Sequence, residues 1–509
     1  IKEHVFLIFF CVQWSTPEDD SYVAAAVEYQ VSADVAQNLI NYVQLIKDAA
    51  EQGADVIVFP ELTLTRGTRS VDVPIYGLLK THPIPALEPN SYDELMFGIS
   101  AAAREHQIYV LINVQEIMNC TEIPEDSEEY CPEKKEYLFN TNVIFDRTGA
   151  VIDRYRKINL FGEFSRTPAL RPDLGMFSTD FGVTFGHYVC FDLMFQVPAI
   201  QVVEKNKITD VLFSTMWFSE MPYLTAVQIQ EAYAYAQNVN FIGAGANNVR
   251  VGSAGSGIYS GKAGALVSTM PGVPTTRLIV SRVPKVPGNI TGMIFPGPIY
   301  DSPTDHDSLV LITDPSLPDH TSRLLVPGFQ EFTLVDKEVS CTFRVRLTPR
   351  EGEGYQYRAL AFDGERSFSG LGEGDTRICS VIPCTGDSID TCGKRFPVYA
   401  QNSTSIFDEL TIVATMPTPV LDTRLDAHDS SFFPLSLDVS IMPLESNEYT
   451  FSEVESNGQT VFTYTLVNSE KELYSFAVWG RVFEPAPGSS VAPVLMLSPS
   501  VPILTLLEG

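Results

Sequence analysis

One cysteine, Cys190, stands at the end of an apolar run in the stretch Phe-Gly-His-Tyr-Val-Cys-Phe-Asp-Leu-Met-Phe, residues 185–195. Read locally, Phe185 to Val189 is a short strand, and Asp192 marks the turn that leaves it. A thiol at a strand end, with core behind it and a loop crevice in front, is placed where a nucleophile would act. A packed cysteine would give the same pattern, because free cysteine behaves as a small hydrophobe. This window alone leaves both interpretations open.

Two charged residues elsewhere also follow apolar runs. The run Ala54 to Phe59 predicts a buried strand that leads to Glu61, and a strand predicted at Val151 to Tyr155 leads to Lys157. Ends of neighbouring strands in an α/β sheet meet in one crevice even when they are far apart in the chain. A carboxylate there would take the thiol proton, an ammonium would favour the thiolate and then an oxyanion, and the Phe191 backbone N–H would be a second oxyanion donor. Such a site would transfer an acyl group through a thioester.

The cysteine count supports a functional thiol. The chain has eight cysteines, and Cys11 falls in a segment predicted to be removed, which leaves seven. An oxidising compartment favours pairing, and an odd number leaves one thiol over. Cys120 and Cys131 bracket an acidic loop and are predicted to pair. Four more can form two bridges with three possible connectivities: Cys341, Cys379, Cys384 and Cys392. Cys190 is the remaining thiol.

The elements around these residues alternate between strands and helices, which predicts an α/β layered domain at 20–285. Besides those above, the strands are predicted at Tyr22–Val27, Ile108–Val114, Asn142–Asp146, Asp210–Ser214 and Asn240–Ala244. The helices are predicted from an N-cap at Ser32 to Gly53, and at Ser91–His106, Pro198–Lys205 and Thr225–Asn238.

A second domain is expected because 509 residues are too many for one ordinary core. From residue 286 onward Pro, Thr, Ser and Asp become common and the helical period fades. Alternating runs typical of strands appear at Ser340–Leu347, Gln356–Phe362, Thr460–Leu466 and Tyr474–Phe483. We therefore predict a mainly β domain at 286–487, stapled by disulfides.

Three stretches resemble the Glu, Lys and Cys motifs of the nitrilase (carbon–nitrogen hydrolase) superfamily: Phe59–Leu62, Arg154–Glu163 and Tyr188–Phe195. The similarity is strongest to its vanin/biotinidase branch, and C-terminal stretches such as Arg377–Cys384 and Gly480–Glu484 extend it over nearly the whole mature chain. The resemblance implies an α-β-β-α sandwich with an appended β-rich domain. Both features agree with the α/β and β patterns described above.

The same resemblance implies roles for individual residues. Glu61 would be the general base, Lys157 the oxyanion and proton-positioning group, and Cys190 the nucleophile. Glu163 resembles the accessory glutamate near the lysine motif, although this chain is about one residue shorter there than the vanin pattern. No cofactor is implied, and no His, Cys, Asp or Glu cluster has the spacing of metal ligands.

The charged residues also have purely structural interpretations. Glu61 follows a proline and fits the start of a helix, and Lys157 fits a solvated charge beside Arg154 and Arg156. Taken singly, such residues are more often structural than catalytic. The odd cysteine and the matching flanks together favour the functional interpretation.

Several neighbours of the predicted site are given structural roles. His187 precedes Cys190 by three, and on a strand that separation puts the two side chains on opposite faces, so His187 is predicted to pack. Asp192 is predicted to orient the turn. Trp217, at the end of a following strand, fits a pocket wall and core filling equally well. The glycines from Gly252 to Gly264 lack a phosphate-loop pattern and predict a flexible loop over the pocket.

The ends of the sequence bear on location. Residues 1–18 contain a short apolar run that fits a secretory signal. Residues 488–509 form an apolar tail after small residues, a partial match to a lipid-anchor signal whose polar spacer is missing. Three Asn-x-Ser/Thr sequons are compatible with secretion: Asn119, Asn289 and Asn402. We expect an extracellular protein, either free or anchored at the cell surface through a lipid.

Composition narrows the range of partners. The formal net charge of −29, from 34 Lys and Arg against 63 Asp and Glu, repels phosphate backbones and anionic lipid headgroups. Nucleic acid is therefore excluded as a partner, and a small-molecule amide is expected.

Three functional hypotheses follow. The first is a secreted amidase that cleaves a linear carbon–nitrogen bond through a cysteinyl thioester; the resemblance implies pantetheine as substrate, with pantothenate and cysteamine as products. The second is a biotinidase that acts on biotinyl amides, because the motif residues are shared. The third, from another class, is a catalytically silent glycosylated protein that uses the fold for binding or adhesion.

Overall fold

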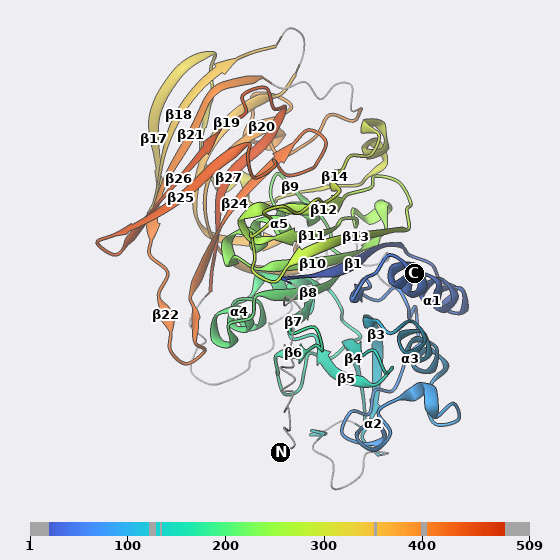
Figure 1. The fold of residues 1–509 in the computed structure, drawn as a ribbon. Helices are drawn as coiled ribbons and strands as arrows, with labels where there is room; N and C mark the ends of the chain where they lie inside the picture. Colours follow the sequence, from blue (N-terminus) through green and yellow to red (C-terminus); the bar gives the residue numbers. More distant parts are fainter. Residues whose placement is uncertain (1–19, 122–128, 133–134, 351–353, 399–404, 484–509) are drawn as a thin grey trace, which may run out of the picture.

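The computed structural model describes residues 20–121, 129–132, 135–350, 354–398 and 405–483. The predicted leader at 1–18, the sequon at Asn402 and the apolar tail at 488–509 lie outside these residues. Every helix within the described ranges is too short or too polar to cross a bilayer. Figure 1 shows an α/β unit formed by the N-terminal half and a β unit formed by the C-terminal part.

The α/β unit is built on two sheet halves that meet where β1 pairs with β10 through Tyr29–Ala246 and Gln30–Asn247. The first half runs β13 (Arg277–Pro284), β1 (Ser21–Gln30), β2 (Val56–Val58), β3 (Tyr109–Asn119), β4 (Glu136–Phe145) and β5 (Val151–Arg156). The second half runs β6 (Gly175–Ser178), β7 (Thr184–Val189), β8 (Asp210–Thr215), β10 (Asn240–Asn247), β11 (Ser256–Ser260), β12 (Ala265–Thr269) and β14 (Gly297–Ile299).

The two halves face each other across an apolar interior. Ala24 and Ala26 of β1 point into the same cluster as Leu212 of β8 and Ile242 of β10. Their alternate neighbours, such as Ala25, lie in a separate cluster on the outer face. Successive residues of a strand point to opposite faces, so each strand is covered on both sides. This explains the continuous apolar runs from which the strands were predicted.

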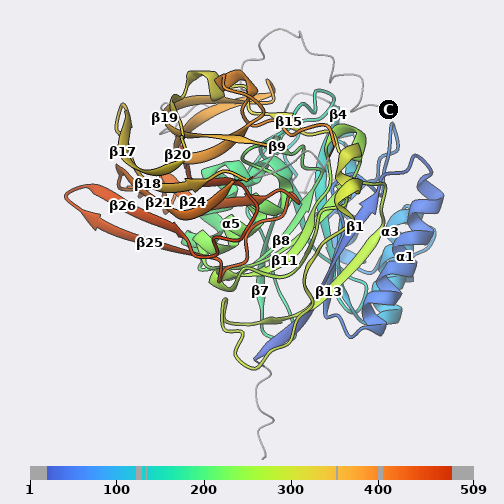
Figure 2. The same cartoon turned by 90° about the horizontal axis from the view of Figure 1, so that it is seen from above.

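Helices cover the two outer faces, as Figure 2 shows. The first sheet half is covered by α1 (Val35–Glu51) and α3 (Glu94–His106), and the second by α4 (Gln201–Asn206) and α5 (Ala226–Gln237). A short helix, α2 (Leu78–Thr81), lies beside the first half. The predicted α-β-β-α sandwich is therefore confirmed.

Two local predictions in this unit were wrong. Helix α1 is capped by Asp34, whose side chain accepts a hydrogen bond of 3.0 Å from the Gln37 N–H, and the predicted cap Ser32 lies before it. The glycine-rich stretch Gly252–Gly264 contains the buried strand β11 rather than a flexible loop over the pocket. Small residues there let the backbone approach Gly245 closely, since a Cβ on that glycine would lie 2.3 Å from the Gly255 carbonyl oxygen.

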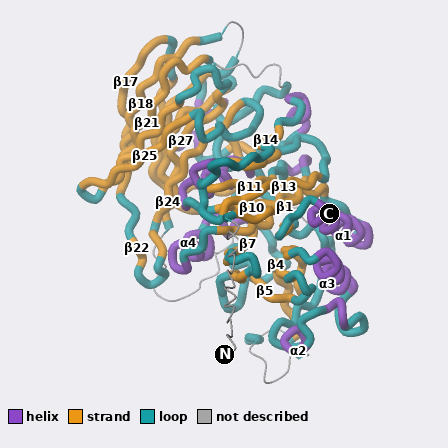
Figure 3. The backbone as a smooth tube through the Cα atoms, viewed as in Figure 1, coloured by secondary structure: helices purple, strands orange, loops and turns teal. Residues whose placement is uncertain are grey.

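The β unit consists of two five-stranded antiparallel sheets, the strand-rich part of Figure 3. One sheet runs β16 (Thr321–Leu324), β19 (Gln356–Phe368), β20 (Gly372–Cys384), β27 (Leu473–Val482) and β24 (Ser430–Asp438). The other runs β17 (Gly328–Asp336), β18 (Val339–Thr348), β21 (Ile406–Pro417), β26 (Gln459–Leu466) and β25 (Tyr449–Ser456). Two short pairs complete the described strands: β9 (Glu220–Met221) with β15 (Ile312–Thr313), and β22 (Leu421–Asp422) with β23 (Ala427–His428).

The six cysteines predicted to pair do so. Cys120–Cys131 closes the acidic loop, Cys341–Cys379 links β18 of one sheet to β20 of the other, and Cys384–Cys392 ties the end of β20 to the loop after it. These bonds resolve the three connectivities that the sequence allowed. Cys190 is the free cysteine of the described residues.

The two units share a core rather than a thin linker. Tyr233 of α5 stacks on Phe433 of β24, with ring centroids 6.4 Å apart, and both lie in one buried cluster. The chain also leaves the first unit later than the boundary predicted near residue 286, because β14 still pairs with β12 at Gly297–Ile299. The composition changes in the loops that flank β14 and lead from the first unit to the second. It therefore changes before the chain has left the first unit.

Candidate active site

Three strand ends meet at one edge of the sandwich. Glu61 follows β2, Lys157 is the residue after β5, and Cys190 is the residue after β7. Two of these strands belong to the first sheet half and the third to the second, so the side chains converge between the halves. All three are buried, with 4%, 1% and 4% of their surface exposed, respectively.

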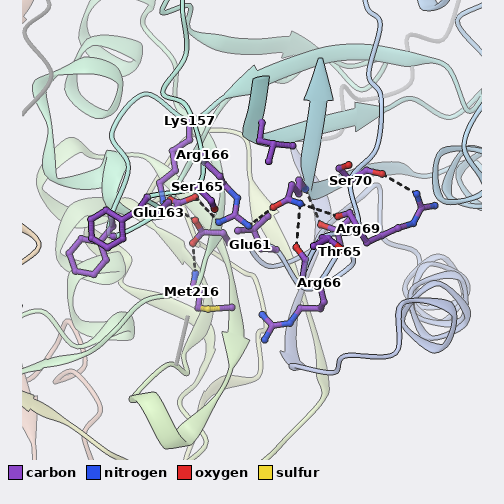
Figure 4. Close-up of a pocket in the computed structure, with 18 of the residues that line it drawn as sticks. Glu61, Thr65, Arg66, Arg69, Ser70, Lys157, Glu163, Ser165, Arg166 and Met216 are labelled. Carbon is purple, nitrogen blue, oxygen red and sulfur yellow. Dashed lines mark hydrogen bonds and ion pairs between the residues drawn. The ribbon is translucent and has the colours of Figure 1, made fainter. Parts of the chain in front are cut away.

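The ammonium of Lys157 is held between two carboxylates (Figure 4). Its Nζ lies 2.8 Å from Glu61 Oε1 and 2.6 Å from Glu163 Oε1. Asn140 of β4 donates from Nδ2 to the same pair, at 2.7 Å to Glu61 Oε1 and 2.9 Å to Glu163 Oε2. The second oxygen of Glu61 accepts a hydrogen bond of 2.8 Å from the Met216 N–H. Every charge in the cluster therefore has a partner, as buried charges require.

Cys190 sits at a sharp bend in the backbone. Its φ is +50°, in the left-handed region that residues other than glycine adopt at a cost, and it begins a 3₁₀ helix at Cys190–Met194. Its Sγ lies 3.6 Å from the Met216 carbonyl oxygen. At this bend the buried Cys190 lines the same pocket as Glu61, Lys157 and Glu163.

Asp192 holds this bend in place. Its carboxylate accepts hydrogen bonds from the Tyr155 hydroxyl at 2.7 Å, from the Asn159 N–H at 2.8 Å and from the Val189 N–H at 3.2 Å. Burial raises its pKa to about 6, against the opposing effect of Lys157 and of these donors. All of its oxygens are occupied, which fits the predicted role of orienting the turn.

The charges around the thiol favour its neutral form. Burial raises the pKa of Cys190 well above its usual range, and the negative charge of Glu61 raises it further, while Lys157 lowers it by less. Lys157 therefore favours the thiolate, as predicted, but burial and the charge of Glu61 together outweigh it. Two carboxylates already neutralise Lys157, so its ammonium stabilises a thiolate at Cys190 only weakly.

Ion pairs determine the charge states of Lys157 and Glu163. Burial alone would lower the pKa of Lys157, but Glu163 and Glu61 raise it well above its usual value. Burial alone would raise the pKa of Glu163, but Lys157 and Arg166 lower it. The resting site therefore holds an ammonium, an ionised Glu163 and a neutral thiol.

These side chains open into a pocket of about 450 Å³. Its other walls come from the loop after Glu61, which carries Arg66 and Arg69, from the loop after Lys157, which carries Arg166, and from Gln115 of β3. Figure 4 shows Arg66 and Arg69 on the side of the pocket away from Lys157, whereas Arg166 lies beside Glu163. The walls combine a carboxylate, an ammonium and a thiol with room for a small substrate.

A small apolar recess adjoins the thiol. It is lined by Phe191, Trp217, Phe218 and Phe368, together with Cys190 itself. Trp217 thus faces this recess, and its indole N–H donates 2.8 Å to the Leu224 carbonyl oxygen. Phe368 comes from β19 of the β unit, so the second unit contributes a side chain next to the Cys190 thiol.

Other predicted residues lie apart from the pocket. His187 is buried on β7, with Nε2 2.8 Å from Asp153 Oδ2, and packs as expected. Of the sequons, Asn289 is exposed and Asn119 is half-buried, with its side chain bonded to Thr121. In the described ranges, no group of three or more His, Cys, Asp or Glu residues is arranged to hold a metal ion.

Asn140, Asn113 and Arg166 belong to the site although no prediction named them. Asn113 accepts from the Leu62 N–H at 2.9 Å and donates 2.8 Å to Asn140 Oδ1, so a chain of amides ties the turn after β2 to β4. A usable signal existed, since Asn140 and Asn142 lie two apart in an apolar segment and share one face.

Comparisons with known proteins agree with this geometry. The carbon–nitrogen hydrolase family pattern matches residues 23–266, and the vanin C-terminal domain pattern matches residues 310–486. Vanin-like protein 1 of Drosophila melanogaster is 33% identical over 501 residues, covering 93% of this chain and 88% of that protein. A pantetheinase from Sus scrofa is 28% identical, covering 79% of this chain and 82% of that one. Human biotinidase is 28% identical, covering 76% and 78%, respectively.

The family assignment rests on both units at once. The α/β sandwich with its cluster of carboxylates, ammonium and thiol falls within the hydrolase match, and the two β sheets fall within the C-terminal match. The chain therefore belongs to the vanin/biotinidase branch of the nitrilase superfamily, and it is a carbon–nitrogen hydrolase that acts on amides.

Proposed function

We propose that this hydrolase cleaves a linear amide through a thioester on Cys190, and that its substrate is pantetheine, which yields pantothenate and cysteamine. One observation supports the chemistry above all others. The Lys157 ammonium, 2.8 Å from the Glu61 carboxylate, lines the same pocket as the free Cys190 thiol. The similarity to a pantetheinase over most of both chains supports the substrate.

The first half-reaction forms the acyl-enzyme. Glu61 takes the proton from the Cys190 thiol as the sulfur attacks the carbonyl carbon. The Lys157 ammonium and the Phe191 backbone N–H stabilise the oxyanion that develops. As the carbon–nitrogen bond breaks, Glu61 gives its proton to the leaving nitrogen, so the amine departs neutral and the acyl group stays on sulfur.

The second half-reaction reverses these proton transfers. Glu61 takes a proton from a water molecule, the water oxygen attacks the thioester carbon, and the sulfur leaves as the thiol. Glu163 and Asn140 are positioning residues in this scheme, because they hold Lys157 and Glu61 through the contacts at 2.6 and 2.7 Å. A carboxylate that is paired with Lys157 and lines the same pocket as a neutral thiol suits this sequence of steps.

Biotinyl amides form the second candidate substrate class. The favouring observation is the similarity to human biotinidase, which covers three quarters of this chain. A silent binding role on the same fold is disfavoured, because a retired site would be free to lose the carboxylate, the ammonium or the thiol. All three are present, and the carboxylate and the ammonium are paired with each other.

The proposed setting is extracellular. Three disulfides in the described residues support it, because such bonds persist in oxidising compartments. The exposed Asn289 sequon supports glycosylation. A glycosidase-dependent shift in electrophoretic mobility of the secreted protein would test both points, and release from cells by a phospholipase would test the lipid anchor.

The decisive experiment compares pantetheine and a biotinyl amide as substrates of the wild type and of Cys190→Ala. We expect the wild type to favour pantetheine and the variant to lose activity by at least about 10³-fold, the scale of removing a nucleophile. Equal turnover by the two proteins would rule out the thioester mechanism. A preference for the biotinyl amide would transfer the assignment to the second candidate.

A further inference from the structure

We propose that the apolar recess beside the thiol binds the first two carbons of the acyl arm of the substrate, and that Phe368 of the β unit limits their size. The enzyme accordingly selects amides of straight-chain acids, in which two methylene groups follow the carbonyl carbon. It rejects acyl groups that branch next to the carbonyl, including those of peptides. This inference rests on the proposed function, because it concerns the amide that Cys190 attacks.

The recess adjoins the pocket at Cys190 but lacks the charged groups of the proposed mechanism. Cys190, Phe161 and Phe218 line both spaces. Glu61 and Lys157 line the pocket and not the recess. The further apolar walls of the recess are Phe191, Trp217, Leu224 and Phe368. A group that binds there is therefore in contact mainly with apolar side chains.

The tetrahedral intermediate directs the acyl arm toward this recess. Its central carbon carries four groups: the Cys190 sulfur, the oxyanion, the nitrogen and the first carbon of the acyl arm. The nitrogen must lie near Glu61, which gives it a proton, and the oxyanion must lie near Lys157. Because these two groups are held on the pocket side, the acyl carbon points away from them. The recess is the space beside the sulfur that neither Glu61 nor Lys157 lines.

The size of the recess matches two methylene groups. Its volume is about 30 Å³, against about 450 Å³ for the pocket. One water-sized group needs about 10–15 Å³ on this scale, so the recess holds about two such groups. A methyl branch adds a third group to a space that is already full. The acyl groups of pantetheine and of biotinyl amides both begin with two methylenes, so the inference holds for either candidate substrate.

Phe368 is fixed in the recess wall by the hairpin that carries it. It is the last residue of β19, it pairs with Gly372 at the start of β20, and it is buried. Its ring meets that of Phe191 edge to face, with centroids 5.5 Å apart. A Cβ on Gly372 would lie only 3.0 Å from the Phe191 ring, so the hairpin packs closely against this wall. The tip of a hairpin from the β unit therefore sets one boundary of the space beside the thiol.

Buried ion pairs hold the hairpin tip against the α/β unit. Arg366 donates to Glu220 of β9, and the other carboxylate oxygen of Glu220 accepts from the Ser369 hydroxyl. Arg366 also lies 3.1 Å from Asp314, and its guanidinium lies 4.7 Å from the centroid of the Phe368 ring. Glu220 lines the recess, but both of its oxygens are engaged by the β unit. The recess therefore keeps a defined shape, as a site that selects by size requires.

The test compares amides that differ in the position of one methyl group. Whichever candidate substrate the enzyme cleaves faster is assayed beside an analogue with a methyl group on the acyl carbon next to the scissile carbonyl. A second analogue carries the methyl group on the amine carbon next to the nitrogen. Each kcat/KM is divided by the rate constant for alkaline hydrolysis of the same amide, which removes differences in intrinsic reactivity.

We expect the two methyl positions to differ. The methyl group on the acyl arm should lower the corrected kcat/KM of the wild type by about 10–200-fold, the effect of one surplus carbon in an apolar pocket. The methyl group on the amine arm faces the larger pocket, so this analogue should be cleaved at nearly the rate of its parent.

Variants of Phe368 assign the preference to that side chain. Phe368→Leu and Phe368→Ala enlarge the recess, so the ratio of parent to acyl-branched amide should fall toward one, and further in the alanine variant. Phe329→Ala, at an exposed position of β17 in the same unit, is the matched control and should keep the wild-type ratio. If Phe368→Ala does not fold, Phe368→Leu decides, and the wild-type comparison of the two methyl positions needs neither variant.

The outcomes separate this inference from the function on which it rests. Equal cleavage of the parent and the acyl-branched amide by the wild type would overturn the role of the recess and leave hydrolysis through Cys190 intact. A ratio that both Phe368 variants keep in full would do the same, and so would a larger loss from the methyl group on the amine arm. Equal turnover by the wild type and Cys190→Ala would instead refute the proposed function.

Discussion

The thiol of Cys190 rests in a setting that keeps its proton. Burial raises its pKa, the Glu61 carboxylate raises it further, and Lys157 offsets only part of this. In the proposed mechanism the thiolate therefore forms when substrate is attacked, not beforehand. The residue types at this site could be read from the sequence, because each follows an apolar run. The protonation state could not, since it depends on Lys157 being shared between Glu61 and Glu163.

If Glu61 raises the pKa of the thiol, Glu61→Gln should speed the alkylation of Cys190 and slow amide hydrolysis. Glu61→Gln removes the negative charge beside the sulfur, so the pKa of the thiol should fall and iodoacetamide should alkylate Cys190 faster at pH 7.5. Amide hydrolysis should fall by about 10²–10⁴-fold, because the proposed general base is lost. Alkylation rates from pH 6 to 10 would measure the shift, with Cys190→Ala as the unlabelled control. Slower alkylation of the variant would contradict the charge assignment.

At the scale of elements, β4 does more than the sequence indicated. The predicted strand began at Asn142, whereas β4 runs from Glu136 and places Asn140 between Glu61 and Glu163. A strand prediction based only on alternating apolar residues stops at a polar residue such as Asn140, even where the strand continues. The role of Asn140 becomes clear only from the neighbouring strand, where Asn113 of β3, which lies opposite Asn142, donates a hydrogen bond to Asn140 Oδ1. The function of a polar residue in a strand can therefore depend on its partner in the neighbouring strand, which the local sequence does not show.

Asn140→Leu should therefore impair both stability and catalysis. Its amide donates to two buried carboxylates, and loss of such a donor costs about 1–3 kcal/mol of unfolding free energy. We expect the midpoint of thermal unfolding to drop by several degrees and kcat to fall by roughly tenfold or more, since Glu61 loses its support. Asn206→Leu, at the exposed end of α4, is the control. Unchanged kcat in a stable Asn140→Leu protein would refute the positioning role.

The whole molecule behaves as two units with one continuous interface. The sandwich and the β unit could both be predicted, because their periodicities differ. Their junction could not, because it consists of long-range contacts such as the Arg366 ion pair with Glu220 and the position of Phe368 beside the thiol. No local pattern marks residues that meet across such separations in the chain.

The junction also buries an acid whose titration links pH to stability. Glu231 of α5 is buried, and burial, with Glu445 and Glu448 nearby, raises its pKa to about 8. The native state keeps a proton that the unfolded chain loses near pH 4.5. The resulting stabilisation is thus complete below about pH 4.5 and is lost as pH rises toward 8, by about 1.4 kcal/mol for each unit of difference in pKa.

Glu231→Gln isolates this contribution. From pH 5.5 to 8.5, the free energy of unfolding of the wild type should fall relative to that of the variant, as measured by denaturant titration at each pH. Glu105→Gln, at an exposed position in α3, should follow the wild type. Parallel curves for the wild type and Glu231→Gln would show that Glu231 titrates normally in the folded protein.

The central claim is that an acyl group passes through sulfur at Cys190, and trapping that intermediate tests it most directly. Wild-type protein would be mixed with pantetheine, quenched in acid within milliseconds to seconds, and analysed by intact mass and peptide mapping. We predict a mass increase equal to the pantothenoyl group on the peptide that contains Cys190, with no such increase in Cys190→Ala. Multiple turnovers by the wild type without any acyl adduct, or an adduct on another residue, would contradict the claim.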